Sequence, residues 1–410
     1  MYVPKHLEAR SNYFFLKQVL NVNRTGRKDK RNDVKILITT DLYKPLINGV
    51  VTSVINLKQG LEDQGHEVRI LTLSRTVQSA EKEGVYYIGS INVGDVYPGA
   101  RISLKMPAAM YKSIISWKPD VVHSQCELST FRYARKISEA CGVPFVHTYH
   151  TLYENYTHYL PVLGRFCGLL VPKLTTVVLR RTDRVIAPTS KVKRILGKYG
   201  ISSPVSVVMS GVDYQKLARK PSDDWIVQKK KVLRINRNSL CLICVGRLAK
   251  EKRVDELLRL VAKCKDMPIK LVLVGDGPDK NRLKRLCERL HIADRVAFTG
   301  MISPKDIWMY YHLGDVFVNA SESETQGLSN AEAMAAGLPM LCRRDECLDQ
   351  MIQDGVNGWQ YRNSCEFRDY LKKLLLDDAL RKRMSLNSMM KAQQLSIANF
   401  ANEVINCYAE

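Results

Sequence analysis

Two basic side chains in the second half of the chain follow a segment that we expect to be a buried strand. Arg247 comes just after the apolar run LCLICVG, and Lys252 follows five residues later, before a helix-like stretch. A pyrophosphate suits such a loop, because a guanidinium binds two oxygens at once while an ammonium acts as a compact charge. Basic residues at loop ends are also often simply solvated. This pair alone therefore does not establish that a ligand binds there.

Two carboxylates lie eight positions apart in the later segment NASESETQGLSNAEAMAAGLP. They are Glu324 and Glu332, and between them Gly327, Leu328 and Ser329 form the expected start of a helix. A helix start offers free backbone N–H groups and the positive end of the dipole to a phosphate. We therefore expect Glu324 to reach sugar hydroxyls and Glu332 to reach a ribose diol. Alternatively, Ser329 and Glu332 form a capping box within their own helix.

The segments that must position these residues alternate between short β-branched runs and helix-like stretches along most of the 410 residues. This pattern predicts an α/β protein of two doubly wound, Rossmann-like domains whose strand ends face a central cleft. We expect a polar, basic extension at 1–33, a first domain at 34–213 and a second domain at 214–387. Residues 388–410 are expected to form a C-terminal helix that packs back on the first domain.

The first half contributes two further strand-end motifs. Asn48-Gly49 follows the first expected strand and predicts a turn with positive φ, where backbone can approach a phosphate. His147 and His150 follow a later strand. A metal site there lacks a third and a fourth ligand at suitable spacing, and the chain contains no Asp-x-Asp motif. We therefore expect neither a divalent metal nor a cofactor, and assign His147 a packing role.

Taken in order, these motifs resemble the E-x7-E region of the retaining glycosyltransferases with the GT-B fold, in their fourth family. The resemblance implies that Glu324 contacts the donor sugar, that Glu332 binds the ribose, and that Arg247 and Lys252 hold the pyrophosphate. It also implies that Gly49 lies near the donor phosphate and that His150 lies near the donor sugar and the acceptor. The implied mechanism is attack from the same face, without a covalent intermediate.

The acceptor is suggested by a second resemblance. The segments DVVHSQCELS, with His123 and Glu127, and HTYHTLYENYTHYLP, with Tyr153 and Glu154, are similar to those of bacterial diacylglycerol glucosyltransferases. This implies transfer of a hexose, expected to be glucose from UDP-glucose, to the 3-hydroxyl of 1,2-diacylglycerol. A glycolipid, cell-wall or soluble acceptor stays open. A nucleotide-sugar epimerase is a more distant alternative, disfavoured by the E-x7-E motif.

The formal net charge of +22 favours an anionic partner. Bases are dense at 180–198 and in RISLKMPAAMYKSIISWK, where Arg101, Lys105, Lys112 and Trp117 belong to a mixed basic and apolar pattern. That pattern predicts a helix, starting near Pro107, that rests on an anionic membrane. A core-facing helix with solvated lysines is the alternative, and nucleic-acid binding lacks a recognition module.

The expected cellular location follows from these patterns together. No apolar run approaches the roughly 18 residues of a membrane span, and no secretory signal opens the chain. The cysteines are scattered, as buried thiols in a reducing compartment would be. We therefore expect a cytoplasmic protein that associates peripherally with the inner face of the cell membrane.

Overall fold

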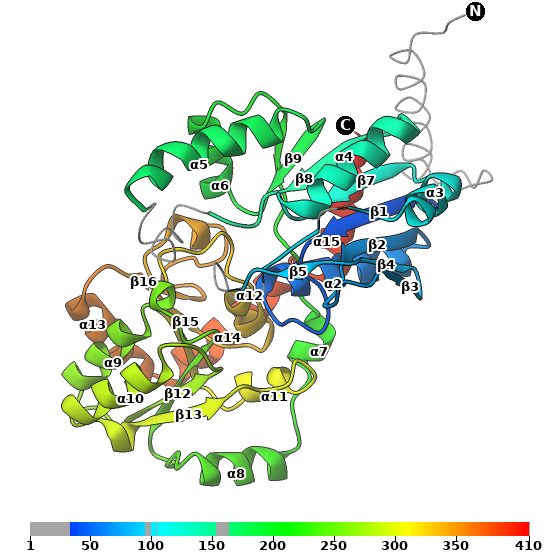
Figure 1. Cartoon of the computed structure of the whole chain (residues 1–410). Helices are drawn as coiled ribbons and strands as arrows, with labels where there is room; N and C mark the ends of the chain where they lie inside the picture. The colour runs from blue at the N-terminus through cyan, green and yellow to red at the C-terminus, as the bar shows by residue number, and fades with distance from the viewer. Residues whose placement is uncertain (1–32, 95–99, 104, 153–163, 410) are drawn as a thin grey trace, which may run out of the picture. The chain divides into compact units, whose positions relative to one another are not determined.

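The computed structural model describes residues 33–94, 100–103, 105–152 and 164–409, without the side chains of 164–170. Its contacts divide the chain into two compact units. Unit 1 comprises the described residues up to Gly211 together with those from Ile397 onward, and unit 2 is Val212–Ser396. Each unit contains one large sheet with helices on its faces (Figure 1).

Unit 1 is built on an eight-stranded sheet in the order β10-β9-β8-β7-β1-β2-β4-β3. All neighbours are parallel except β3 and β4. The strands are β1 (Lys35–Thr40), β2 (Glu67–Leu73), β3 (Ala80–Lys82), β4 (Val85–Ile88), β7 (Val121–Ser124), β8 (Phe145–Thr148), β9 (Arg184–Ala187) and β10 (Val205–Val207). A separate hairpin joins β5 (Ile91–Asn92) to β6 (Arg101–Ile102). The strand order reverses between β1 and β7, and such a switch point is where open α/β sheets bind ligands.

The helices of unit 1 cover both faces of this sheet. They are α2 (Gly49–Asp63), α3 (Ala108–Trp117), α4 (Ser129–Cys141), α5 (Gly164–Leu179), α6 (Ser190–Lys198) and α15 (Ile397–Ala409). Successive β1 side chains point to opposite faces. Accordingly, Ile36 and Ile38 pack in the core with Phe400 of α15, whereas Leu37 packs in the core with Ile114 of α3.

Unit 2 has a six-stranded parallel sheet in the order β13-β12-β11-β14-β15-β16. Its strands are β11 (Leu240–Val245), β12 (Ile269–Val274), β13 (Val296–Gly300), β14 (Val316–Asn319), β15 (Met340–Arg343) and β16 (Gly358–Tyr361). Its helices are α7 (Tyr214–Ala218), α8 (Asp223–Val232), η2 (Lys250–Lys252), α9 (Val254–Lys263), α10 (Lys280–Arg289), η3 (Ala293–Arg295), α11 (Ile307–Tyr311), α12 (Leu328–Ala335), η4 (Glu346–Leu348), α13 (Ser364–Leu376) and α14 (Asp378–Gln393). Every residue of β12 is buried, as expected for a parallel strand covered on both faces.

The C-terminal segment differs from the predicted boundary at 388. Helix α14 belongs to unit 2, where Ser388 and Ala392 are buried and Gly337 lies against Met389. The chain joins unit 1 only from Ile397, and α15 lies beside α2 (Figure 1). A side-chain carbon at Gly60 of α2 would lie 2.9 Å from the side chain of Ala401, so this glycine permits the close approach of the two helices.

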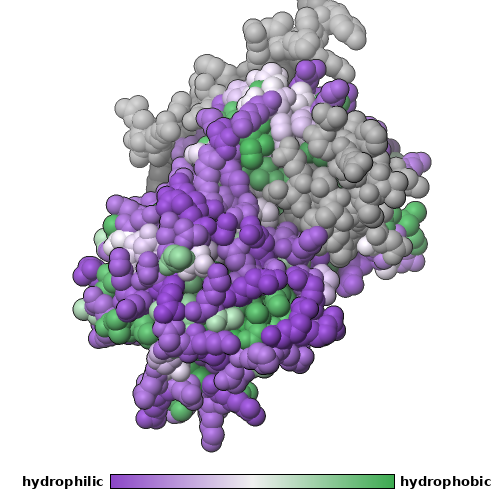
Figure 2. All heavy atoms as spheres, turned by 90° about the vertical axis from the view of Figure 1, so that its left-hand side faces the viewer, coloured by the Kyte–Doolittle hydropathy of each residue, from purple (hydrophilic) through white to green (hydrophobic). Residues whose placement is uncertain are grey.

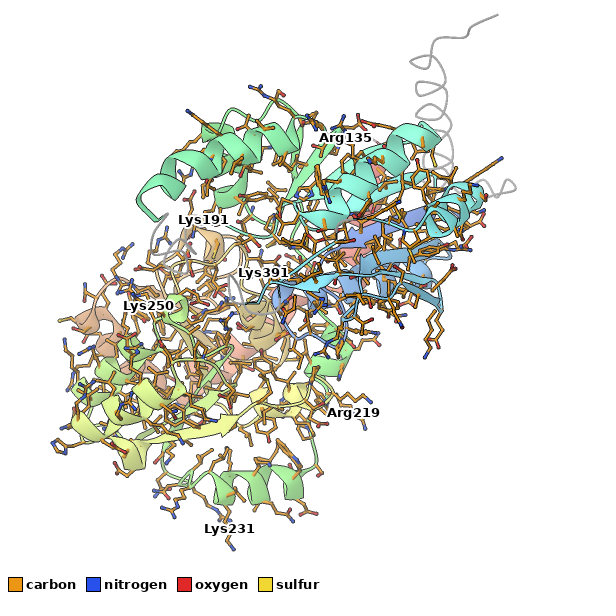
Figure 3. All side chains as sticks on the ribbon, viewed as in Figure 1. Arg135, Lys191, Arg219, Lys231, Lys250 and Lys391 are labelled. Atoms are coloured by element: carbon orange, nitrogen blue, oxygen red, sulfur yellow. The ribbon has the colours of Figure 1, made fainter. Side chains whose placement is uncertain are left out.

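Basic side chains occur in both units. Arg219 and Lys231 of unit 2 extend away from the ribbon in Figure 3. Among the described residues, no helix is long and apolar enough to cross a membrane.

Candidate functional site

Two strand-end turns of unit 2 lie backbone against backbone. Leu248, after β11, donates its N–H to the carbonyl of Asp276, after β12, over 3.0 Å. A side-chain carbon at Gly275 would lie 2.1 Å from the carbonyl oxygen of Gly246, and one at Gly277 would lie 2.3 Å from that of Leu248. Any larger residue would force these turns apart. The glycines thus fix the backbone that carries Arg247 at the carboxyl end of the sheet.

Lys252 and Glu324 form a direct ion pair at this end of the sheet. Lys252 Nζ lies 2.5 Å from Glu324 Oε1. Burial by itself lowers the pKa of the lysine, but the charge of Glu324 and its hydrogen bond outweigh burial, so the pKa is raised and the ammonium keeps its proton. Two hydroxyls tie the surrounding loops together, because Ser321 and Ser323 both donate to the carbonyl of Glu251.

The turn before α12 is built around Gly327 and Asn330. Gly327 has φ +74°, and a side-chain carbon there would lie 2.3 Å from Asn330 Nδ2. That amide donates to the carbonyl of Gly327 over 3.0 Å, and its oxygen accepts from Asn319 of β14. Leu328 and Ser329 follow as the first helical residues, and no side chain caps the helix. The start of α12 therefore presents backbone N–H groups next to Glu324.

Glu332 does not form the capping box that was one alternative. Helix α12 begins at Leu328, so Ser329 is already inside it. Glu332 Oε2 instead accepts from the Tyr311 hydroxyl over 2.5 Å. Burial raises the pKa of Glu332, while the bond from Tyr311 and the charge of Lys216 oppose that rise. The capping interpretation is therefore wrong, and the carboxylate is positioned by a neighbouring helix.

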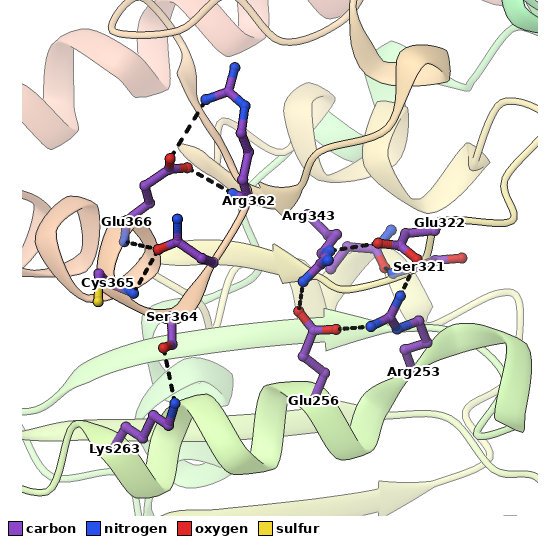
Figure 4. Close-up of polar contacts among 12 residues, drawn as sticks. Arg253, Glu256, Lys263, Ser321, Glu322, Arg343, Arg362, Ser364, Cys365 and Glu366 are labelled. Atoms are coloured by element: carbon purple, nitrogen blue, oxygen red, sulfur yellow. Dashed lines mark hydrogen bonds and ion pairs between the residues drawn. The ribbon is translucent and has the colours of Figure 1, made fainter.

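A ring of four charged side chains supports the loop before Glu324 (Figure 4). Arg343 of β15 binds Glu256 of α9 and Glu322, each over 2.7 Å. Arg253 closes the ring through the same two carboxylates. Arg253 has the left-handed φ of 49°, which an arginine rarely adopts. Sequence inspection missed this ring, because its members are spread over four elements, and it also missed Asn319, Asn330 and Tyr311.

In unit 1, the prediction of a turn with positive φ at Asn48-Gly49 is wrong. Asn48 is extended (φ −159°), and its side-chain oxygen accepts from the N–H of Val51 over 2.9 Å. It is therefore the N-cap of α2, and Gly49 is the first helical residue. Asparagine at this position stabilises a helix start after β1, which still presents backbone N–H groups at the switch point of the sheet.

Polar groups gather after β1, β7 and β8, which are neighbours in the sheet. His150 Nε2 lies 2.7 Å from Gln125 Oε1, and His147 Nε2 lies 3.2 Å from Glu127 Oε1. Burial lowers the pKa of His150 to about 4, although the charge of Glu127 opposes this, so His150 is neutral near pH 7. Both candidates of this segment, His150 and Glu127, thus lie at strand ends beside the switch point.

Asp41 belongs to the same strand-end group, although no motif in the sequence predicted it as a site residue. It directly follows β1 and is buried, with Oδ1 accepting the N–H of Thr130 over 2.8 Å. No hydrogen-bond partner reaches Oδ2 within the described residues. Burial raises the pKa of this carboxyl to about 6, while the bonds from Thr130 limit the rise. Asp41 is therefore a titratable group at the switch point.

His123 does not fit the predicted contact with an acceptor. Its side chain is fully buried in β7, with Nδ1 2.7 Å from the Tyr408 hydroxyl and Nε2 2.7 Å from Thr148 Oγ1. Both ring nitrogens are thus occupied within unit 1, and burial lowers the pKa of the ring well below its usual value. Its contacts instead join α15 to β8. The remaining candidates of the acceptor segment, Tyr153 and Glu154, lie outside the described residues.

The predicted membrane helix is a core helix. Helix α3 begins directly after Pro107, as expected, but Met110, Ile114 and Trp117 are buried. Trp117 Nε1 donates to Glu67, and Arg101 binds the hydroxyl and carbonyl of Ser90. The lysines, Lys105 and Lys112 among them, are exposed, as are the small residues Ala108, Ala109 and Ser116. The large side chains Met110, Ile114 and Trp117 are thus occupied in the core, so the core-facing alternative describes this helix.

Family models match both halves of the chain. Residues 226–389 match "Glycosyl transferases group 1", and residues 47–216 match "Glycosyltransferase Family 4". The alpha-monoglucosyldiacylglycerol synthase of Acholeplasma laidlawii is 30% identical over 381 residues, covering 90% of this chain and 94% of that protein. The synthase of the same name from Streptococcus pneumoniae is 29% identical, covering 92% and 86%.

Solved structures show the same fold. Alr3699/HepE of Anabaena, crystallised with UDP-glucose, superimposes with a TM-score of 0.68 at 17% identity, over 91% of this chain and 98% of that one. The two parallel Rossmann-like sheets confirm the predicted GT-B fold. Together with the matched models and relatives, they show that this chain belongs to the group 1, family 4 glycosyltransferases, and that it is a retaining glycosyltransferase.

Proposed function

We propose that this enzyme transfers glucose from UDP-glucose to the 3-hydroxyl of 1,2-diacylglycerol at the inner face of the cell membrane, with retention of the α configuration. The names of the two synthases support the product, and the UDP-glucose complex of a protein of the same fold supports the donor. The observation that carries the proposal is the Lys252–Glu324 pair beside the uncapped start of α12.

The donor roles follow from the chemistry of that site. Arg247 and Lys252 provide cations for the pyrophosphate, and the N–H groups at Gly327, Leu328 and Ser329 add the positive end of a helix dipole. Glu324 accepts hydrogen bonds from sugar hydroxyls, and Glu332 accepts from the ribose. Lys252, Glu324 and Glu332 are oriented by contacts within unit 2, and such preorganised charges lower the barrier to departure of the diphosphate.

The transfer step needs no covalent enzyme intermediate. The bond from the sugar C1 to the phosphate oxygen breaks as the acceptor hydroxyl oxygen bonds to C1 from the same face. The hydroxyl proton passes to the departing phosphate oxygen, so atoms and charge balance. In unit 1, we assign Gly49 to backbone contact with the donor phosphate, Glu127 to the acceptor, and His150 to the reacting sugar. His150 acts as a neutral hydrogen-bonding group, because its pKa of about 4 keeps it uncharged.

Product analysis tests this function. The purified chain is incubated with UDP-glucose and with other nucleotide-sugars, in the presence of dispersed diacylglycerol, and the lipid product is identified by mass and anomeric configuration. We expect α-glucosyldiacylglycerol with UDP-glucose. Transfer only to a glycolipid, a cell-wall acceptor or a soluble acceptor would agree with the proposed donor site. It would exclude diacylglycerol as the acceptor. Sugar interconversion without an acceptor would indicate the epimerase alternative.

A further inference from the structure

Gln125 follows β7, and its side chain reaches the end of the neighbouring strand β8. Its N–H donates to the carbonyl of Thr39 of β1 over 2.8 Å, and its side-chain oxygen Oε1 lies 2.7 Å from His150 Nε2. Hydrophilic residues cover most of the side of the molecule drawn in Figure 2, as is usual for polar side chains. Gln125, in contrast, is only 2% exposed, and its carboxamide is buried beside a residue of the candidate site.

The backbone on both sides of this contact is held in place. Ser124 Oγ donates to the carbonyl of Cys126 over 2.9 Å, which fixes the turn after β7. Tyr149, directly before His150, donates its N–H to the carbonyl of Ile186 of β9 over 2.9 Å, and its side chain is fully buried. The contact between Gln125 and His150 therefore joins two anchored strand ends.

The contact determines which ring nitrogen of His150 carries the proton. A carboxamide oxygen only accepts hydrogen bonds, so Oε1 of Gln125 requires a proton on Nε2 of the ring. The pKa of about 4 keeps the ring neutral near pH 7, which leaves a lone pair on Nδ1. Among the described residues, none forms a hydrogen bond with Nδ1, and the ring is partly exposed. Nδ1 is therefore an acceptor available to a substrate hydroxyl.

The amide nitrogen of Gln125 indicates that packing is not the role of this side chain. Nε2 is buried, and no hydrogen-bond acceptor reaches it within the described residues. A buried donor without a partner is unfavourable, and an apolar side chain of similar size would remove it. The described part of the chain thus gives the carboxamide one hydrogen bond, to the ring of His150. A glutamine here is explained by that bond rather than by the stability of the core.

A neighbouring pair shows what a charged acceptor would do. His147 Nε2 lies 3.2 Å from Glu127 Oε1, and the charge of Glu127 also raises the pKa of His150 against the effect of burial. A carboxylate at position 125, in direct contact with the ring, would favour a second proton on His150 and so occupy the Nδ1 lone pair. A neutral amide orients the ring without this effect.

We propose that Gln125 is a positioning residue, which holds His150 as the Nε2–H tautomer so that Nδ1 accepts a hydrogen bond from a hydroxyl of the donor sugar. The inference rests on the proposed function, which assigns His150 to the reacting sugar. Gln125 itself acts through the ring and need not touch the substrate. Its carboxamide supplies an acceptor of fixed position, and its lack of charge keeps the second ring nitrogen free of a proton.

Nitrogen NMR of the histidine rings tests the tautomer directly. The full chain, with its eight histidines isotopically labelled, is measured without substrate, and His150 is assigned by the signals that disappear in His150→Asn. We expect Nε2–H in the wild type and a mixture of both tautomers in Gln125→Met, whose side chain has similar length but no comparable acceptor. His123 is the internal control, because Tyr408 and Thr148 occupy its two nitrogens and its tautomer should not change.

The kinetics of the same variant separate positioning from binding. Loss of an oriented acceptor weakens a contact made while the sugar reacts, so Gln125→Met should lower kcat about tenfold and change the KM for UDP-glucose by less than about twofold. Gln59→Met, which removes an exposed amide from α2 in the same unit, should leave both unchanged. Nδ1–H in the wild-type ring, or an unaltered tautomer and kcat in Gln125→Met, would overturn the proposal.

Gln125→Glu tests the role of the neutral amide and stays informative if Gln125→Met does not fold. A carboxylate still accepts from Nε2, so the Nε2–H tautomer should be kept at pH 8 and kcat there should exceed that of Gln125→Met. Its charge should return the pKa of His150 at least to the usual 6.5, so that about three-quarters of the rings are protonated at pH 6.

The expected result for Gln125→Glu is a fall in kcat of about fourfold between pH 8 and pH 6, beyond any fall in the wild type. The wild type is measured in parallel, because both proteins share the other titratable groups around the ring, which are Asp41, His123, Glu127 and His147. Identical pH profiles of the two proteins would overturn the proposal, since a charge in contact with the ring would then not affect the reaction.

The tautomer measurement also separates this inference from the proposed function, since it needs no substrate. If diacylglycerol is not glucosylated but the ring is held as Nε2–H only while Gln125 is present, the proposed function fails and the positioning role stands. If glucosyl transfer is normal but the tautomer and the pH profile do not depend on Gln125, only the positioning role fails.

Discussion

The Lys252 ammonium lies 2.5 Å from the Glu324 carboxylate, although 72 positions separate the two residues in the chain. The parallel sheet creates this contact, because η2 follows β11 and the loop with Glu324 follows β14, and these strands are neighbours. Carboxyl ends of adjacent parallel strands lie at one edge of a sheet. An ammonium and a carboxylate, to which we assign the phosphate and the sugar of the donor, are therefore held together at one edge of the sheet.

Replacement of Glu324 by Gln should remove most of the turnover. The amide is nearly the same size but carries no charge, so it binds sugar hydroxyls more weakly and leaves Lys252 unpaired. We expect kcat/KM for UDP-glucose to fall by at least about a hundredfold, as when one preorganised polar group is removed from an active site. Initial rates of transfer are measured for the wild type, for Glu324→Gln and for the control Glu288→Gln, whose side chain lies on the exposed side of α10. Unchanged kinetics would exclude the role given to Glu324.

Gly327→Ala should destabilise unit 2 and weaken donor binding. The alanine would have to adopt φ +74°, and its methyl group would lie 2.3 Å from Asn330 Nδ2. Gly355→Ala is the matched control, because Gly355 has φ +79° and open space around it. The control should lose roughly 1 to 2 kcal/mol through backbone strain alone. Gly327→Ala should lose more in denaturant unfolding and bind UDP less tightly in calorimetry. Equal losses would show that the contact with Asn330 is unimportant.

Much of this arrangement could be predicted from the sequence, because it depends on local patterns. Continuous β-branched runs indicated buried parallel strands, and the order of Arg247, Lys252 and Glu324 along alternating strands and helices indicated one strand-end site. Side-chain partners from distant elements could not be predicted. His123 lies in a strand-end motif, but Tyr408, 285 positions away, occupies one of its ring nitrogens.

The same limit applies to helices and to single residues. The pattern around Trp117 fits a membrane surface and a protein core equally well, and only the packing against the sheet distinguishes them. In the sequence, Asp41 is a carboxylate that follows a strand, and nothing beside it marks it as unusual. Its raised pKa arises mainly from burial, which the residues beside it in the sequence do not reveal.

Arg343→Lys should loosen the charged ring beside the donor site. Lysine keeps the charge but cannot bind Glu256 and Glu322 at once through a planar fork. We expect a stability loss of about 1 to 2 kcal/mol, because this arginine is mostly shielded from solvent, and a raised KM for the donor with a smaller change in kcat. Arg368→Lys is the control, since its pair with Asp266 is exposed to solvent and should contribute little to stability. A larger loss in the control would contradict the supporting role of the ring.

Asp41→Asn should stabilise the enzyme near neutral pH. Burial raises the pKa of Asp41 to about 6 from a usual value of 3.8, so the folded state binds the proton more tightly than the unfolded state does. Asp41 then contributes stability below about pH 4, and this contribution is lost as the pH rises through 6. Asparagine cannot ionise, yet its oxygen can still accept from Thr130.

The variant should therefore exceed the wild type by roughly 1 to 3 kcal/mol at pH 7.5 in urea unfolding, with the difference shrinking toward pH 4. Asp63→Asn, at the exposed end of α2, is the control and should show little pH-dependent gain. If Asp41→Asn is less stable than the wild type at pH 7.5, the ionised carboxylate stabilises the fold at neutral pH. Burial would then not penalise the ionised carboxylate, and the pH dependence argued from the raised pKa of Asp41 would be excluded.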